Sequence, residues 1–512
     1  MHKIFAVALN LHDHNTYDGV YHNQRERHTR FKHNLPYYAD AYSHQSDILN
    51  TNDYRLNNEF VKEYWKKTDD ILAFTWTNGG IRMMKDQIDK EFLDFVPKKL
   101  FDFVIKDGVY YCDHHQSHAT YAYLNSGFSK SDILAIDGIG AKFRCIFVDK
   151  DENIIDLSKE LPIGWLWNTM SKLTGFGSLG ASKLMGLVGY GHFNQYYYDV
   201  FDVMVSGEIR EKNYDIHKMI KIGEYGKESL AYTLQKFTID KIKKHIYPLK
   251  TCDNLCIAGG VAYNGYMNEE FTKYYKNVFV PPAVGDEGQA IGVYQHANIN
   301  VNNYIHKSET FAGKEYEYIG EEKADYKEIA QAIADGKIVG WFQGKSESGN
   351  RALGNRSILA DPRRKDIKDV INHTIKMRQE FRPFAPAVLE EHYKEYFDTN
   401  CPSPYMSRIC KVKSNKIPGV THVDGTARIQ TVNKKFNEKF YNIINEFYKI
   451  TGIPMLLNTS FNCKEPIVEE PRHAIRTFKR TDLDLLVIND YVIRGKNEHI
   501  WFTRKKTPCK KI

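Results

Sequence analysis

The chain has 512 residues, and its 71 Lys+Arg against 64 Asp+Glu give a formal net charge of +7. At ~100–200 residues per domain, this length predicts two to four domains with a sizeable core. The 42% hydrophobic and 26% charged content excludes a disordered chain, and no apolar run reaches the ~18 residues of a membrane-spanning helix.

The rest of the composition narrows the class. None of the eight cysteines forms a C-x-x-C pair, which favours free thiols in a reducing, cytoplasmic setting over a disulfide scaffold. The first residues read as a buried strand rather than a signal peptide. A charge of +7 neither requires nor excludes a nucleic-acid partner.

Short apolar runs alternate with helix-period stretches through the first part of the chain, which is typical of an α/β architecture with layered sheets. The sequence shows no internal repeat. A polar, weakly periodic stretch at 296–325 predicts a linker. The predicted strands are 5–9, 133–136, 144–148, 255–258, 337–343, 455–457 and 485–488, and the predicted helices are 215–246, 269–275, 326–334 and 438–449.

Two histidines four residues apart are the first candidates for chemistry. His114 and His118 form an H-x-x-x-H pattern. On a helix, residues i and i+4 share a face, so both imidazoles can reach one metal ion. The alternative is a pair of hydrogen-bonded histidines at a helix start, because a metal also needs a ligand from elsewhere in the chain.

Three turns carry glycine or a carboxylate, and the first two directly follow predicted strands. Asp137-Gly138 can hold Mg²⁺ or orient a hydroxyl, although the same pattern also forms an ordinary hairpin. Gly259-Gly260 precedes a helix start, where backbone donors offer a seat for a nucleotide. Asp286 can serve as the third metal ligand or as a helix N-cap.

The second half repeatedly places arginines beside glycine turns and small hydroxyl residues, which predicts a pocket for several phosphates. Guanidinium groups hold phosphate oxygens in bidentate pairs. In Phe381-Arg382-Pro383-Phe384 the arginine stands between apolar residues, so we expect it to be partly buried and to need an anion. The alternative is a solvated basic face. The residues of this pattern are Arg351, Arg356, Lys376, Arg378, Arg382, Arg428, Asn458, Thr459 and Ser460.

Together these motifs make the sequence similar to the O-carbamoyltransferases of the NodU/CmcH family, which act in nodulation-factor and antibiotic biosynthesis. The resemblance covers most of the chain. It departs from the family at 347–350 and at 180–182, where we expect a different loop geometry. The segments that carry it are 114–118, 183–187, 259–262, 285–286, 340–344, 351–363, 381–386, 421–428 and 456–462.

The resemblance implies two domains and two steps. Residues 1–312 resemble the actin/hexokinase-like (ASKHA) fold of the tRNA threonylcarbamoyl transferases, and residues 313–512 resemble a YrdC-like twisted α/β domain. The YrdC-like domain would form carbamoyladenylate from carbamoyl phosphate and ATP, with Mg²⁺. The first domain would then pass the carbamoyl group to an acceptor hydroxyl beside a metal, with AMP leaving. The first domain is also shorter than usual in the family, which implies an open or differently covered acceptor pocket.

The family's functional residues carry over to numbered positions. A divalent metal, with Fe²⁺ expected, would be held by His114, His118 and Asp286. Carbamoyl phosphate and the ATP phosphates would be held by Arg351, Lys376, Arg382, Arg428 and Ser460. The nucleotide contacts would be Asp137, Gly138, Gly259, Gly260, Asn264 and Asn458. The transferred carbamoyl group would face His12, Asp13 and Lys32.

Several alternatives stay open at this point. The family suggests a small sugar or antibiotic scaffold as acceptor, whereas the basic segments 25–33 and 504–511 allow a hydroxymethylated base in DNA. A tRNA threonylcarbamoyladenosine-type enzyme would share both folds, and a non-catalytic nucleotide or carbamoyl-phosphate sensor would share the pocket. The resemblance is also compatible with a homodimer.

Overall fold

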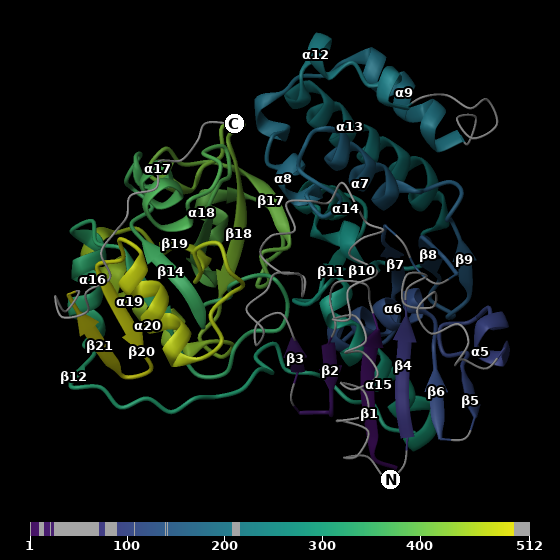
Figure 1. Cartoon of the computed structure of the whole chain (residues 1–512), viewed down its shortest axis with the longest axis horizontal. Coiled ribbons are helices and arrows are strands. Elements are labelled where there is room, and N and C mark those ends of the chain that lie inside the picture. Colours follow the sequence, from purple (N-terminus) through teal and green to yellow (C-terminus); the bar gives the residue numbers. More distant parts are fainter. Residues whose placement is uncertain are drawn as a thin grey trace, which may run out of the picture.

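The computed structural model of the chain describes residues 2–9, 15–20, 22–24, 71–76, 90–106, 108–138, 140, 142–206 and 216–495. Within these ranges the strands form three sheets, of six, five and ten strands (Figure 1). The first two sheets are built from residues 4–279 and the third from residues 322–494. The protein therefore has the mixed α/β fold that the alternating sequence pattern predicts.

The first two sheets differ in size but not in plan. The six-stranded sheet runs β3 (His22–Gln24), β2 (Asn15–Tyr17), β1 (Ile4–Leu9), β4 (Ile71–Trp76), β6 (Val109–Tyr111) and β5 (Val104–Lys106). The five-stranded sheet runs β11 (Asn277–Phe279), β10 (Asn254–Ala258), β7 (Asp132–Ile136), β8 (Cys145–Val148) and β9 (Ile154–Asp156). Strands β7 and β10 are buried on both faces, which explains why each reads as a continuous apolar run.

These two sheets repeat one strand order, although the sequence shows no repeat. In each sheet the first strand in the chain, β1 or β7, pairs antiparallel with the second, which pairs antiparallel with the third. The first strand also pairs in parallel with β4 or β10, which pairs in parallel with β6 or β11. The repeat is thus visible in the pairing alone, and β5 is an addition at the edge of the first sheet.

Two helices lie against each other between these sheets. Helix α6 (His114–Ser126) packs on β7 and β10, and helix α15 (Gln289–Asn302) packs on β1 and β4. Helix α6 begins sharply, because the Asp113 side chain accepts from the His115 amide while the Gln116 side chain accepts from the Asp113 amide. The paired helices fix where their first residues lie relative to the strand ends.

Most of the other helices of the first half come between β9 and β10 in the sequence, and they lie at the top right of Figure 1. Before this segment comes α5 (Lys90–Asp94), and after it comes α14 (Gly265–Phe271). The segment itself contains α7 (Ile163–Leu173), α8 (Ala181–Met185), α9 (Gln195–Ser206), α11 (Ile216–Met219), α12 (Ile222–Tyr225) and α13 (Lys227–Ile246).

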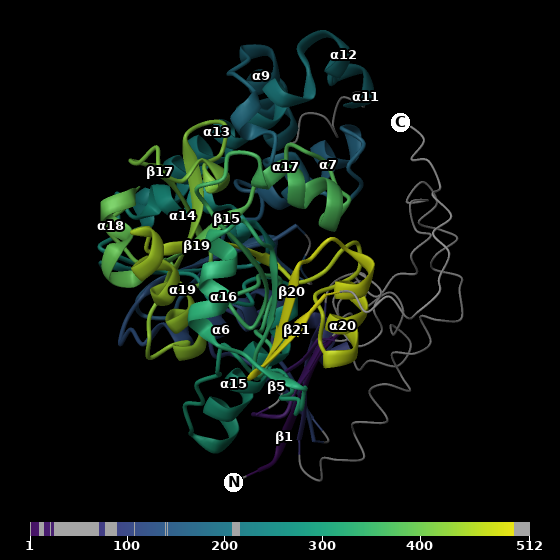
Figure 2. The ribbon, with the colours of Figure 1, turned by 90° about the vertical axis from the view of Figure 1, so that its left-hand side faces the viewer.

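The third sheet forms the body of the second half. Its order is β12 (Glu322–Lys323), β21 (Tyr491–Arg494), β20 (Leu485–Ile488), β13 (Val339–Phe342), β14 (Arg356–Ala360), β19 (Met455–Ser460), β15 (Ala385–Leu389), β18 (Thr426–Val432), β17 (Arg408–Val412) and β16 (Phe397–Asp398). Its helices are α16 (Tyr326–Ala334), α17 (Ile367–Ile371), α18 (Tyr393–Tyr396), α19 (Glu438–Thr451) and α20 (Pro471–Arg480). Figure 2 shows α16 and α19 on one side of β20 and β21, and α20 on the other.

Most predicted elements are confirmed, including the helix at 326–334 and the strand at 485–488, whose bounds agree with α16 and β20. The predicted helix at 215–246 is wrong as a single element, because Gly226 adopts a left-handed φ of 78° and separates α12 from α13. The predicted helix at 269–275 starts earlier, at Gly265, because the Asn264 side chain caps the Met267 amide at 3.1 Å.

The linker predicted at 296–325 begins later than expected, since α15 continues to Asn302. Its polar residues are satisfied inside the fold. The His296 ring contacts the Tyr110 hydroxyl at 2.5 Å, and the Asn300 amide donates to the same hydroxyl at 2.8 Å. Asparagines that look like loop residues in the sequence therefore attach this helix to the first sheet.

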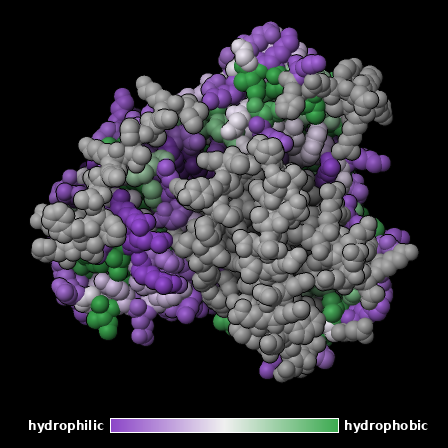
Figure 3. All heavy atoms as spheres, viewed as in Figure 1, coloured by the Kyte–Doolittle hydropathy of each residue, from purple (hydrophilic) through white to green (hydrophobic). Residues whose placement is uncertain are grey.

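The surface of the second half is largely hydrophilic on the face drawn in Figure 3. Among the described residues, no helix combines the length and apolar character needed to cross a bilayer. This agrees with the absence of a long apolar run in the sequence.

Candidate active site

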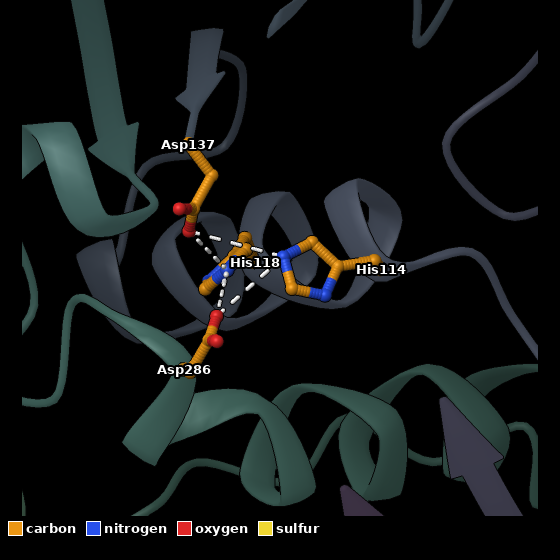
Figure 4. A group of neighbouring side chains, drawn as sticks. All are labelled: His114, His118, Asp137 and Asp286. Atoms are coloured by element: carbon orange, nitrogen blue, oxygen red, sulfur yellow. Dashed lines mark ion pairs between the residues drawn. The ribbon is translucent and has the colours of Figure 1, made fainter. Parts of the chain in front are cut away.

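Four side chains converge where α6, β7 and the start of α15 meet (Figure 4). The His118 Nε2 atom lies 3.3 Å from a carboxylate oxygen of Asp137 and 3.4 Å from one of Asp286. The His114 Nε2 atom lies 3.8 Å and 3.5 Å from the same two oxygens. One ligand atom from each residue lies within 4.8 Å of every other.

Local structure aims each member of this group. The four-residue spacing on α6 places His114 and His118 on one face. Asp137 directly follows β7, and its carboxylate accepts hydrogen bonds from the Gly138 amide at 2.5 Å and the Gly260 amide at 2.8 Å. Asp286 starts the short 3₁₀ turn that leads into α15. Three separate segments therefore build the group.

The electrostatics of the group are those of a cation site. Burial lowers the pKa of His118, but hydrogen bonds and charge attraction from Asp137 and Asp286 outweigh it and raise that pKa to about 9. Burial raises the pKa of Asp137, yet the two histidines hold it well below its usual range. Each of the two carboxylates thus lies within ion-pair distance of both imidazoles.

The residues present fit a divalent metal. Both histidines are buried, and the carboxylate oxygens of Asp137 and Asp286 lie 3.3–3.8 Å from their Nε2 atoms. Two imidazole nitrogens and two carboxylate oxygens are a donor set suited to Fe²⁺, Mn²⁺ or Zn²⁺. Metal–ligand bonds are ~2.0–2.2 Å long, so a small contraction of the group would bring all four atoms to one ion.

Gln289, the first residue of α15, contacts His114 from behind. Its amide lies 2.7 Å from the His114 Nδ1 atom, and the Gln289 Oε1 atom makes no hydrogen bond to any described residue. The same amide nitrogen donates to the His114 carbonyl oxygen at 3.3 Å, so Gln289 holds the ring with its Nε2 atom directed at the two aspartates. Gln289 is therefore placed to fix the imidazole that a metal needs.

A second group, made of arginines, faces the first from the other half. Burial lowers the pKa of Arg351, Arg382 and Arg428, and the charge of Arg351 lowers the pKa of the other two further. The pKa of Arg378 falls to about 9 through burial and the charge of Arg382. In the described ranges, none of these four guanidinium groups forms an ion pair with a carboxylate. Other arginines of the second half, such as Arg363, Arg364 and Arg494, do. Such a group requires an anion.

One cleft joins the two groups. It has a volume of about 620 Å³ and is lined by residues of both halves. Asp137 and Asp286 reach its wall from the first half, with the two histidines buried behind them. Most of the predicted site residues line it, namely Asp137, Gly138, Gly260, Asn264, Asp286, Arg351, Arg382, Arg428, Asn458 and Ser460.

Three predicted residues lie behind the wall of the cleft. Gly259 adopts a left-handed φ of 90°, and a Cβ there would meet the Ile136 carbonyl oxygen, so its lack of a side chain serves packing. Lys376 is buried below Ser460 and donates to the Ser460 hydroxyl at 3.2 Å and to Asn462 Oδ1 at 2.6 Å. Arg356 is buried over the Phe342 ring, and its guanidinium donates to the Gln343 and Gly344 carbonyls.

The segment that departs from the family pattern connects the halves. The Glu347 carboxylate accepts from the Leu353 amide at 2.6 Å, and the Ser348 hydroxyl contacts the His22 ring at 3.0 Å. Gly349 has a φ of 93° and presses against the backbone of Pro282 and Ala283. These contacts hold the loop that presents Arg351, whose guanidinium lies 5.1 Å from the Tyr263 ring centre.

Some predictions cannot be placed. His12, Asp13, Lys32 and the basic segments 25–33 and 504–511 lie outside the described residues. Conversely, the cleft includes residues to which the sequence assigned no role, such as Tyr263, Lys368 and His422, and it also includes Arg378. Arg378 stands in the predicted phosphate pattern, two residues after Lys376, so a signal for it was present.

The sequence matches two family models that together span most of the chain. Residues 16–294 match the Carbamoyltransferase N-terminus and residues 330–495 match the Carbamoyltransferase C-terminus. A distant likeness in structure, with a TM-score of 0.32 and 10% identity over 59% of this chain and 97% of the other, links it to the activator of the 2-hydroxyisocaproyl-CoA dehydratase from Clostridium difficile with bound ADPNP. That likeness is too remote to decide the fold of either half.

Two curated relatives agree with the family models. The nodulation protein NolNO of Sinorhizobium fredii is 35% identical over 449 residues, covering 75% of this chain and 64% of NolNO. The chain thus spans slightly less than two thirds of that relative. The nodulation protein NolO of Bradyrhizobium diazoefficiens is 33% identical over 441 residues, covering 75% of this chain and 79% of NolO. With both halves matched in order, the chain belongs to the carbamoyltransferase family, of the NodU/CmcH type.

Proposed function

We propose that the protein is an ATP-dependent O-carbamoyltransferase. With Mg²⁺ it makes carbamoyladenylate from carbamoyl phosphate, water and ATP, releasing phosphate and pyrophosphate, and it then transfers the carbamoyl group to an acceptor hydroxyl, releasing AMP and a proton. The observation that carries this proposal is a cleft of about 620 Å³ in a member of the carbamoyltransferase family. The arginine group lines one side of this cleft, and the His/Asp group lies at the other. One cleft lined by both allows an activated intermediate to form beside one group and react beside the other.

The arginine side suits the activation step. Arg351, Arg382 and Arg428 can neutralise the phosphates of carbamoyl phosphate and ATP, because they have no carboxylate to release first. Lys376 below them orients the hydroxyl of Ser460, which reaches the wall of the cleft. Adenylation is useful because it gives the carbamoyl group a better leaving group than phosphate.

The histidine side suits the transfer step. His114, His118, Asp137 and Asp286 would hold the metal, for which Fe²⁺ is our expectation. When bound, such an ion can polarise the carbamoyl carbonyl or lower the pKa of the acceptor hydroxyl. The chain's own contribution is orientation: the Gly138 and Gly260 amides fix the Asp137 carboxylate, and Gly138, Gly260, Asn264 and Asn458 line the space for the nucleotide.

Two fold assignments belong to the same proposal. We assign residues 1–312 to an actin/hexokinase-like transfer domain and residues 313–512 to a YrdC-like domain. The repeated strand order of the first two sheets, with α6 and α15 between them, supports the first assignment. The mixed ten-stranded sheet, which carries Arg351, Arg382 and Arg428 in or before its inner strands β14, β15 and β18, supports the second.

A two-stage assay tests the proposal. The protein is incubated with carbamoyl phosphate, ATP and Fe²⁺, and carbamoyladenylate and AMP are quantified. His114→Ala should form carbamoyladenylate but not transfer it, whereas Arg382→Ala or Lys376→Ala should fail at the first stage. If Arg382→Ala and Lys376→Ala both leave adenylate formation intact, the assignment of the second half is wrong.

The same assay separates the other candidates. A tRNA threonylcarbamoyladenosine-type enzyme would require threonine and bicarbonate, and a sensor would bind nucleotide without releasing AMP. Sugars, antibiotic scaffolds and hydroxymethylated DNA are then offered as acceptors. We expect a small-molecule acceptor, and DNA binding that weakens as salt rises would favour DNA instead.

A further inference from the structure

A histidine with no role so far lies in the arginine side of the cleft. His422 is in the turn before β18 and lines the cleft. Its Nδ1 atom lies 3.1 Å from the Thr426 hydroxyl oxygen, which lies 2.6 Å from the Asp424 Oδ1 atom. The other Asp424 oxygen accepts from the Tyr266 hydroxyl of α14 at 2.7 Å. A chain of polar contacts thus runs from the first half to this imidazole.

This chain fixes the tautomer of His422. A hydroxyl has a single proton, and a carboxylate can only accept, so the Thr426 proton points to Asp424. The Thr426 oxygen can then only accept from the imidazole, which places the ring proton on Nδ1. The Nε2 atom is left with its lone pair, as an acceptor.

The surroundings keep the ring neutral. Burial lowers the pKa of His422 to about 4, and Arg428 and Lys368 push it in the same direction. Asp424 and the Phe384 backbone oppose this shift only in part. The Phe384 backbone carbonyl would accept from a protonated ring. In the neutral ring the Nε2 atom is buried, and none of the described residues donates to it. A buried acceptor of this kind requires a donor.

We therefore look for the donor in the ligand, because no described residue donates to Nε2. Arg428 donates to the Met406 carbonyl at 3.0 Å and the Tyr263 carbonyl at 3.3 Å. Carbamoyl phosphate has acceptor oxygens on its phosphate and N–H donors only on its carbamoyl amide. Acetyl phosphate has the same phosphate but a methyl group in place of the amide.

We propose that His422 Nε2 accepts a hydrogen bond from the carbamoyl N–H of carbamoyl phosphate, and that this contact distinguishes carbamoyl phosphate from other acyl phosphates. The inference rests on the proposed function and adds a specificity-determining residue to it. The arginines hold the phosphate of any acyl phosphate, whereas the hydrogen bond to His422 distinguishes a carbamoyl group from other acyl groups. A site built around a hydrogen bond discriminates against an analogue that lacks the donor, because its own polar group is left unpaired.

The test uses the full chain with its metal in the carbamoyladenylate assay. KM is measured for carbamoyl phosphate and for ATP, and acetyl phosphate is added as a competitive inhibitor. His422→Phe should raise the KM for carbamoyl phosphate by about 10-fold, the size of one hydrogen bond to a substrate. The inhibition constant of acetyl phosphate and the KM for ATP should stay within about 2-fold of wild type on the same reasoning.

Three further variants guard against a purely structural effect. His422→Gln retains an acceptor oxygen near the Nε2 position and should keep most of the discrimination. Thr426→Val removes the group that holds the proton on Nδ1 and should lose part of it, whereas Thr426→Ser should behave like wild type. Thermal unfolding of each variant shows that the fold is retained.

The outcomes separate the two proposals. A wild-type protein that makes no carbamoyladenylate overturns both. A wild-type protein that makes it, with a His422→Phe variant whose KM for carbamoyl phosphate is unchanged, overturns only the role of His422. Equal weakening of carbamoyl phosphate and acetyl phosphate, or a rise confined to the KM for ATP, would show that His422 does not read the carbamoyl amide.

Discussion

The two sides of the cleft hold similar residues in opposite electrostatic settings. The metal side is the group of His114, His118, Asp137 and Asp286. There His118 lies between two carboxylates, and its pKa rises to about 9. On the arginine side, His422 is buried beside Arg428 and Lys368, and its pKa falls to about 4. The metal side pairs opposite charges within the protein, whereas the arginine side holds like charges close together, which an anion would stabilise.

The largest expected effect comes from the metal side. His118→Ala removes a ligand that no other described side chain can replace, so metal affinity should fall by more than the ~10–100-fold typical of outer-shell changes. Carbamoyl transfer should be lost, while carbamoyladenylate formation continues. Metal content by mass spectrometry and both partial reactions are measured.

A control for this variant is His373→Ala, whose side chain is 56% exposed and paired with Glu380 away from the cleft. It should retain both metal and transfer. Loss of adenylate formation in His118→Ala would contradict the separation of the two sides.

The second effect concerns the geometry of the arginine side. Arg382→Lys keeps the charge but loses the planar pair of donors, and we expect about a 10-fold loss in adenylate formation, with about 100-fold for Arg382→Ala. Metal content should not change in either variant. Arg472→Ala, at an exposed arginine of α20, is the matched control. Equal rates for the lysine variant and wild type would show that Arg382 supplies only charge.

Most residues of the metal side could be identified from the sequence, because short local patterns point to them. The i, i+4 histidines need only a helix, and the carboxylate of Asp286 needs only a turn before a helix. The fourth member, Asp137, was predicted as a nucleotide contact. It joins the histidines because β7 pairs with β10 and α6 packs on both, which no local pattern reveals.

The arginine side shows a different limit. Arg351 and Arg356 are five residues apart in the same glycine-rich segment, and the phosphate pattern includes both, although the family resemblance assigns a role only to Arg351. Arg351 lies in the loop before β14 and faces the cleft, whereas Arg356 is the first residue of the strand and is buried against backbone carbonyls. Which arginine binds an anion depends on where the strand begins, and local composition does not determine that boundary.

A third, smaller effect tests the electrostatic repulsion among the arginines of the cleft. Arg382→Met keeps an apolar stem of similar length and removes one of the like charges, so the ligand-free protein should become more stable by up to about 1 kcal/mol. Inorganic phosphate should then stabilise wild type more than the variant. Urea unfolding with and without phosphate measures both quantities. A variant less stable than wild type in the absence of phosphate would show that Arg382 is already neutralised in the fold.

The smallest effect is a pH dependence that sets the two histidines apart. Because the pKa of His422 is about 4 in the fold and ~6.5 when unfolded, its contribution to stability is complete above pH 6.5. That contribution is lost as the pH falls toward 4, since the unfolded chain takes up a proton first. His422→Gln removes the titration, so its melting temperature should fall less between pH 7.5 and pH 5, by ~1–2 °C.

The measurement uses metal-loaded protein, in which His118 is held as a ligand and does not titrate. Phosphate should shrink the difference further, because an anion beside Arg428 raises the pKa of His422 toward its ordinary value. Equal acid sensitivity in both proteins would mean that the arginine side does not hold His422 neutral, and the contrast between the two sides would then rest on the metal side alone.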